Sequence, residues 1–159
     1  MIKRSTLENL LEEQHKDAFF WSKQCCRLKP DEAEDVLQMA YLKVLDGKAK
    51  YSEKSSFKTW LFAIIRFTAI DHLKGNAVFS SFDDLENEVA EESTYQEKNY
   101  EQLLAQLPAR QSEVLLLAFY HGMTLEEIAK TTGLHIGTVR THYARGKAGL
   151  KKLLLKEEV

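Results

Sequence analysis

Basic side chains near the carboxyl end of this 159-residue chain are the first feature with a definite chemistry. From Lys130 to Lys156 the sequence holds seven basic residues and no acidic one, although the whole chain has a net charge of −2. Such a local excess of positive charge attracts the phosphates of a nucleic acid. A basic patch by itself is equally compatible with a solvated helix surface, so the spacing of the residues has to decide.

The spacing in this segment is that of a helix with two different faces. Small or apolar residues recur at steps of three and four, which predicts a buried stripe of Ile136, Val139, Tyr143, Gly146 and Leu150. The opposite face is small and basic, and it carries Thr138, Arg140, Thr141, Ala144, Arg145 and Ala148. A DNA major groove admits a helix whose contact face lacks bulk, and arginine pairs with guanine O6 and N7 there. Three further cations are close enough to meet the phosphate backbone: Lys147, Lys151 and Lys152.

A capping box and a glycine turn precede this helix. Thr124 and Glu127 have the spacing at which each side chain binds the other's backbone N–H, which predicts a short helix over 125–130. Gly133 suits the tight turn that follows, because it adopts positive φ without strain. The second helix is expected over 136–154. Together these signals favour a helix-turn-helix that reads DNA over a generic helical hairpin.

The rest of the chain predicts an all-α fold in two modules, since proline (2) and glycine (7) are scarce. A first domain, residues 1–75, is expected to contain three helices: 6–27, 32–45 and 57–73. Asp31 is the expected N-cap of the second helix, Gly47 ends it, and 47–56 form a polar loop. A second domain, residues 98–159, adds helices over 98–106 and 109–120. Residues 76–97 hold seven acidic residues and no basic one, and we expect them to form a flexible linker.

Other kinds of site have little support in the sequence. Cys25 and Cys26 are adjacent on a helix, so we expect two reduced thiols, at least one of them in the core. We expect neither a metal site nor a cofactor, because no His or Cys stands at a metal-site spacing. The pair Asp71–His72 lacks a nucleophile at a suggestive spacing, so we do not expect an enzyme. The longest apolar runs are about six residues, too short to span a bilayer, and the chain is expected to be cytoplasmic without membrane insertion.

Three stretches of the sequence resemble one known family. The segment LPARQSEVLLLAFYHGMTLEEIAKTTGLHIGTVRTHYARGKAGLKKLL is similar to region 4 of sigma-70-type transcription initiation factors. DEAEDVLQMAYLKVL resembles regions 2.1–2.2, and SSFKTWLFAIIRFTAIDHLKG resembles regions 2.3–2.4. The TLEEIA and TVRTH segments also resemble the output domains of LuxR-type regulators, which have no counterpart of the first module. A layout of regions 2 and 4 without regions 1.1 and 3 is typical of the extracytoplasmic-function (ECF) group.

The resemblance implies a protein that binds core RNA polymerase, directs it to promoter DNA and helps to open the duplex. Region 4 would read the −35 element through Thr138, Arg140, Thr141, Ala144, Arg145 and Lys147. Region 2 would bind the −10 element, including a base flipped out of the non-template strand, through Lys50, Tyr51, Lys54, Ser55, Ser56, Phe57, Arg66, Phe67 and Lys74. Asp35 and Gln38 would dock on the clamp coiled coil of the polymerase, and an anti-sigma factor is an expected partner. Trp60 belongs either to this interface or to the core.

The chain departs from the family pattern at four places. Met39 stands where a Glu is frequent, Phe67 where an Asn is common, and His142 at a position that is often basic. The basic run that often follows the DHLK segment ends here at Lys74. Two alternatives therefore remain: a sigma-like mimic that sequesters an anti-sigma protein without directing transcription, which the shortened basic run would fit, and a LuxR-type regulator that ignores the polymerase.

Overall fold

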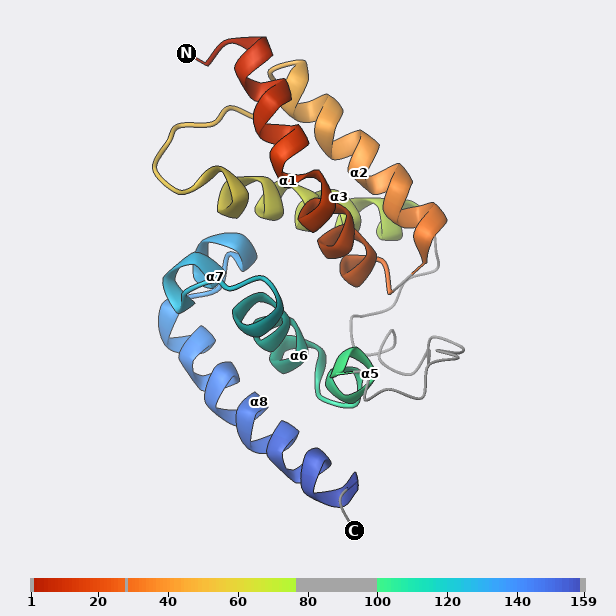
Figure 1. Ribbon diagram of the computed structural model, residues 1–159, viewed down its shortest axis with the longest axis vertical. Helices are drawn as coiled ribbons and strands as arrows, with labels where there is room; N and C mark the ends of the chain where they lie inside the picture. The colour runs from red at the N-terminus through yellow and green to blue at the C-terminus, as the bar shows by residue number, and fades with distance from the viewer. Residues whose placement is uncertain (1, 28, 77–99, 158–159) are drawn as a thin grey trace. The chain divides into compact units, whose positions relative to one another are not determined.

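The computed structural model describes residues 2–27, 29–76 and 100–157 (Figure 1). Within these ranges every regular element is a helix, which confirms the all-α prediction. The chain divides into two compact units. The N-terminal unit holds α1, α2 and α3, and Lys130–Gly133 at the end of α7 are grouped with it. The C-terminal unit holds α5, α6, α8 and the rest of α7. The predicted acidic linker, 76–97, lies outside the described residues except for Asn76. None of the described helices is long and apolar enough to cross a membrane.

The N-terminal unit consists of α1 (Arg4–Cys25), α2 (Pro30–Leu45) and α3 (Phe57–Asn76), close to the predicted ranges. In Figure 1, α1 and α2 pack side by side and α3 crosses both. The ring of Trp21 stacks on that of Phe62 with centroids 5.6 Å apart, and its Nε1 donates to the Phe62 carbonyl at 3.0 Å. This bond matters because an indole N–H removed from water needs an acceptor. The contact therefore fixes α1 against α3.

The start of α2 differs from the prediction. Asp31 is not the N-cap, because the helix already begins at Pro30 and Lys29 occupies the capping position. Proline is favoured at the first helical position, where its fixed φ suits the helix and its missing N–H is not needed. Asp31 instead lies in the first turn, where its charge complements the helix dipole. At the other end Gly47 has φ +82°, which confirms its expected role after the helix.

The C-terminal unit consists of α5 (Tyr100–Ala105), α6 (Ala109–Leu115), the π-helical turn η1 (Leu116–Tyr120), α7 (Leu125–Thr132) and α8 (Ile136–Glu157). Its core centres on Leu104, Leu107 and Leu115, against which residues of α8 pack. Two glycines of α8 lie close to the rest of the unit, Gly146 against α6 and Gly149 against the turn between α5 and α6. A Cβ on Gly146 would lie 3.1 Å from Leu115 Cγ, and one on Gly149 would lie 2.7 Å from Leu107 Cδ2.

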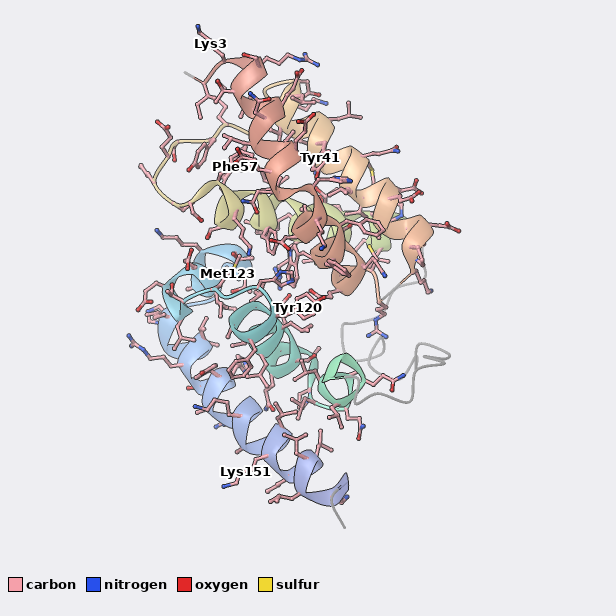
Figure 2. The ribbon with its side chains drawn as sticks, viewed as in Figure 1. Lys3, Tyr41, Phe57, Tyr120, Met123 and Lys151 are labelled. Carbon is pink, nitrogen blue, oxygen red and sulfur yellow. The ribbon has the colours of Figure 1, made fainter. Side chains whose placement is uncertain are left out.

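The expected α-helix over 109–120 changes its pitch at Leu116. The His121 backbone N–H bonds the Leu116 carbonyl at 3.2 Å, a step of five residues instead of four. The widened turn places Leu117 in the core and leaves the rings of Phe119 and Tyr120 exposed. Figure 2 shows Tyr120 at the end of this turn and Met123 on the segment that leads from it towards α7.

Candidate nucleic-acid interface

The helix-turn-helix of the C-terminal unit has the capping contacts that the sequence predicts. Thr124 N–H donates to Glu127 Oε1 at 3.0 Å, and Glu127 N–H donates to Thr124 Oγ1 at 3.1 Å. Each side chain thereby satisfies a backbone donor that the first turn of a helix leaves open. The helix runs two residues beyond the expected end, to Thr132, and Gly133 has φ +76° in the turn that follows. The reciprocal cap and the glycine fix the start of α7 and its exit towards α8.

His135 caps α8, a role that the sequence analysis did not assign. The Gly137 backbone N–H donates to His135 Nδ1 at 3.1 Å, and the Val139 N–H bonds the His135 carbonyl at 3.0 Å. In the tautomer that accepts this hydrogen bond at Nδ1, the ring proton is on Nε2. The sequence contains one indication of this role, because His135 is the polar residue directly before the apolar stripe of α8.

The two faces of α8 are those predicted. Val139 and Gly146 are buried and the other stripe residues are partly buried. All the expected DNA-facing residues are exposed: Thr138, Arg140, Thr141, Ala144, Arg145 and Lys147. The Lys147 ammonium lies 4.7 Å from the centroid of the Tyr143 ring, and Lys151 extends into solvent (Figure 2). The exposed face is therefore basic and, at Ala144 and Ala148, free of bulk, as a groove-binding helix requires.

His142, where relatives often have a basic residue, is half-buried. Its Nδ1 is inaccessible to solvent, and no hydrogen-bond partner for it lies among the described residues. This ring therefore does not extend the basic face in the way that Arg140 and Arg145 do.

Three aromatic rings pack together where the loop between α2 and α3 meets α3. Phe57, which was expected to contact the −10 element, is only 8% exposed and belongs to the core. Tyr51 lies 5.0 Å from Trp60 and 5.5 Å from Phe57 between ring centroids, and Phe57 and Trp60 are 5.5 Å apart. The Tyr51 hydroxyl donates to the Ser55 carbonyl at 2.5 Å. Trp60 is half-buried, so it belongs to this cluster and at the same time keeps part of its ring accessible. Lys50 and Lys54 are exposed on the same loop.

Ser56, which the resemblance assigned to DNA binding, also has a structural role that was not predicted. Its hydroxyl accepts the Thr59 N–H at 3.1 Å and donates to Thr59 Oγ1 at 2.9 Å. Ser56 is therefore the side-chain cap of α3. The neighbouring Ser55 hydroxyl makes a longer contact of 3.3 Å with the Ser56 carbonyl.

One face of α3 carries further residues of the expected −10 site. Phe67 is 53% exposed although it is a large apolar residue, and Lys74 is exposed seven residues later. Trp60 lies seven residues before Phe67, and steps of seven return to the same side of an α-helix. Arg66 belongs to α3 as well, about 100° around the helix from Phe67. Its side chain is only 5% exposed, so the structure does not present it on this face as the prediction of a DNA contact requires.

The expected polymerase-docking residues share one exposed face of α2 with a residue that the sequence analysis did not single out. Asp35 and Gln38 are exposed, and Leu42, one turn after Gln38, is 62% exposed. The sequence indicates that Leu42 is exposed, because it falls outside the spacing of three and four residues at which the buried positions of this helix recur. Asp35, Gln38 and Leu42 are called the α2 face below.

The cysteines are free thiols, and Cys26 lies in the core, as expected. Burial, supported by the nearby charge of Glu32, raises the pKa of the Cys26 thiol to about 12, so it is neutral at physiological pH. Among the residues that the structure describes, no group of three or more His, Cys, Asp or Glu side chains could hold a metal ion.

Two family models match the chain, one to each unit. The model of sigma-70 region 2 matches residues 22–78, and that of sigma-70 region 4 matches residues 97–150. RNA polymerase sigma factor SigV of Bacillus subtilis is 28% identical over 100% of this chain and 99% of its own length. ECF RNA polymerase sigma factor SigX of the same organism is 29% identical over 97% of this chain and 87% of its own.

Two solved structures share the fold. The sigma factor RpoE of Bartonella quintana, in complex with the anti-sigma factor NepR, superposes with a TM-score of 0.70. It is 22% identical and covers 92% of this chain and 95% of its own. CnrH in complex with the cytosolic domain of CnrY has a TM-score of 0.67 at 22% identity, covering 96% of this chain and 89% of its own.

Proposed function

The chain belongs to the ECF group of the sigma-70 family and acts in transcription initiation through promoter recognition, and we propose that its two units read two separate promoter elements. Members of the family are non-catalytic initiation factors. In this proposal the C-terminal unit binds the −35 element, the N-terminal unit binds the −10 element, and the α2 face docks on core RNA polymerase. Residues 1–75 and 98–159 are then the two functional domains, and 76–97 link them.

The capped recognition helix carries the −35 half of the proposal. Arg140 and Arg145 are exposed on α8 five residues apart, and no acidic residue lies between Lys130 and Lys156 to oppose them. An arginine fork binds guanine O6 and N7 in the major groove, whereas the flanking lysines hold the phosphates. Thr141 donates its hydroxyl proton to the Gly137 carbonyl at 3.1 Å, so the lone pairs of its oxygen and its methyl group are what DNA would meet.

The aromatic loop and the exposed face of α3 support the −10 half. An unpaired base needs a ring to stack on, and its phosphates need cations. Trp60 and Phe67 offer accessible rings on one face of α3, with Lys50, Lys54 and Lys74 as the cations. Phe67 can stack on a base but cannot form a hydrogen bond with its edge. We therefore expect weaker discrimination among bases at the position that Phe67 contacts than an Asn there would give.

The α2 face has the composition of a docking site for a helical partner. Leu42 is an apolar anchor of the kind that a partner pocket buries, while Asp35 and Gln38 supply polar contacts on its flank. The proposed partner is the clamp coiled coil of core RNA polymerase. One of the two similar solved structures is a complex of a sigma factor with an anti-sigma factor, and we propose that a regulator of that class binds this chain too.

Run-off transcription with purified core polymerase tests the proposal. The templates are a pool of linear duplexes randomised in the −35 and −10 windows, and sequencing of the transcripts shows which bases are enriched. The wild-type chain should enrich both windows, and Arg145→Ala should lose about 1–3 kcal/mol of discrimination in the −35 window alone. Arg110→Ala, an arginine of α6 that pairs with Glu113 at 3.8 Å, is the matched control and should leave both windows unchanged.

Tight binding to an anti-sigma protein without enrichment in either window would refute the proposal. That result would support the alternative of a sigma-like mimic that sequesters an anti-sigma protein. Enrichment that needs no core polymerase, seen as a footprint of the free chain on duplex DNA, would replace the proposal by the LuxR-type regulator.

A further inference from the structure

The loop of residues 50–56, called the 50–56 loop, is tied to itself by a single side chain. The Tyr51 hydroxyl reaches across the loop and donates to the Ser55 carbonyl at 2.5 Å. The bond joins the two ends of a five-residue segment, so Lys54 lies inside the closed ring and Lys50 directly before it. Closing a short segment in this way removes conformations that it would otherwise sample.

The ring of Tyr51 is held as firmly as its hydroxyl. It packs edge-on against Phe57, with an interplanar angle of 85°, and at 38° against Trp60. Both partners belong to the first turn of α3, whose start is fixed by the Ser56 cap. The tyrosine thus holds the loop at two points: its ring lies against the start of α3, and its hydroxyl ties the loop to itself.

The backbone between these points adopts a conformation that an unrestrained chain avoids. Glu53 has φ +62° although it carries a Cβ, and left-handed backbone of this kind is disfavoured for such residues. It persists only where surrounding contacts enforce it. In the 50–56 loop, the Tyr51–Ser55 bond spans Glu53 and supplies that enforcement.

We propose that Tyr51 is a positioning residue: it holds the 50–56 loop in its DNA-binding shape and acts on the −10 element through Lys50, Lys54 and Ser55 instead of contacting the base itself. The inference rests on the proposed function of this loop and changes the role first expected for Tyr51. Its hydroxyl proton is already donated within the protein, and its ring already lies against two others. The groups left to face DNA are those that the closed loop presents.

Two substitutions disturb the loop from different sides. Tyr51→Phe keeps the ring and removes the hydroxyl. Glu53→Pro leaves Tyr51 intact but forces φ to about −65°, which is incompatible with the observed +62°. Tyr41→Phe is the matched control, because the Tyr41 hydroxyl lies 2.9 Å from His15 Nδ1 in the same unit and its loss leaves the loop untouched.

The readout is base enrichment by the holoenzyme on the randomised template pool, with thermal unfolding of each variant as the check on folding. Tyr51→Phe should lower enrichment about three- to tenfold across the −10 positions, the effect of one lost hydrogen bond, and leave the −35 window unchanged. Glu53→Pro should weaken the same positions. Tyr41→Phe should match the wild type in both windows.

Unchanged −10 enrichment in Tyr51→Phe would overturn the inference, as would a loss of equal size in both windows. A change confined to one base position in Tyr51→Phe, without the same change in Glu53→Pro, would also overturn it, since Tyr51 would then read that base directly. Failure of the wild-type chain to enrich either window would instead refute the proposed function. The two failures are therefore distinguishable in one experiment.

Discussion

Replacing Gly146 by alanine tests how closely α8 packs on α6. A Cβ at this position would lie 3.1 Å from both Cγ and Cδ1 of Leu115 and 3.4 Å from Gln111 Cβ. Leu115 is fully buried, so it has little room to move away. Gly137→Ala on the same helix is the matched comparison, because its Cβ would meet only the His135 ring, at 3.4 Å from Nδ1, an ordinary contact distance.

The expected free energies of unfolding follow from two opposing effects. Alanine in place of glycine within a helix stabilises by about 0.5–1 kcal/mol, since it restricts the unfolded chain. Overpacking a filled core costs about 1–3 kcal/mol. Gly146→Ala should therefore destabilise the C-terminal unit by roughly 1 kcal/mol. Gly137→Ala should stabilise it by about 0.5 kcal/mol or slightly more.

Hydrogen exchange of the α8 amides in the full chain measures the stability change in each variant. The method gives the free energy of opening for this helix separately from the rest of the protein. Protection should fall in Gly146→Ala and rise in Gly137→Ala. If the α8 amides of Gly146→Ala were protected from exchange as well as or better than those of the wild type, Leu115 would have moved away from the added Cβ at little energetic cost. The close approach of α8 to α6 would then not set the position of the recognition helix.

Three further outcomes are expected. Thr124→Ala should destabilise the C-terminal unit by about 1 kcal/mol in thermal unfolding, because it removes the acceptor for the Glu127 N–H, whereas Thr124→Ser should retain the cap. Leu42→Ala should barely change stability, since the side chain is 62% exposed, but should weaken binding to core polymerase in a competition assay. Burial raises the pKa of the Cys26 thiol from 9.0 to about 12, so the folded protein keeps the thiol proton at pH values where the unfolded chain has lost it. The contribution of Cys26 to the free energy of unfolding is therefore complete below pH 9 and is lost as the pH rises from 9 towards 12. Cys26→Ala should lack that loss in denaturant titrations.

The features that the sequence predicted correctly depend on residues close together along the chain. Thr124 and Glu127 are three residues apart, so their reciprocal bonds follow from the spacing alone. The faces of α8 follow from helical periodicity, and Gly47 and Gly133 mark turns because few other residues adopt positive φ there. At the start of α2 two local signals competed, and the preference of Pro30 for the first helical position prevailed over Asp31 as a cap.

The features that the sequence did not predict depend on packing between separate elements. The π turn at Leu116 inserts a residue so that Leu117 enters the core, and no periodicity announces an insertion of this kind. The bond from Tyr51 to Ser55 depends on where Phe57 and Trp60 hold the tyrosine ring. Ser56 was expected to contact DNA from its residue type, but its hydroxyl caps α3, which is a matter of register.

The aromatic cluster also gives the protein an optical reporter of its own. The chain has two tryptophans, and both belong to the N-terminal unit. Trp21 is buried and stacked on Phe62, so its emission should respond only to unfolding. Trp60 is half-buried and lies 5.0 Å from Tyr51, so its emission should change whenever the 50–56 loop moves or a base stacks nearby. Loop motion, and the binding of a DNA strand that we propose for this loop, can thus be followed in real time without attaching a dye.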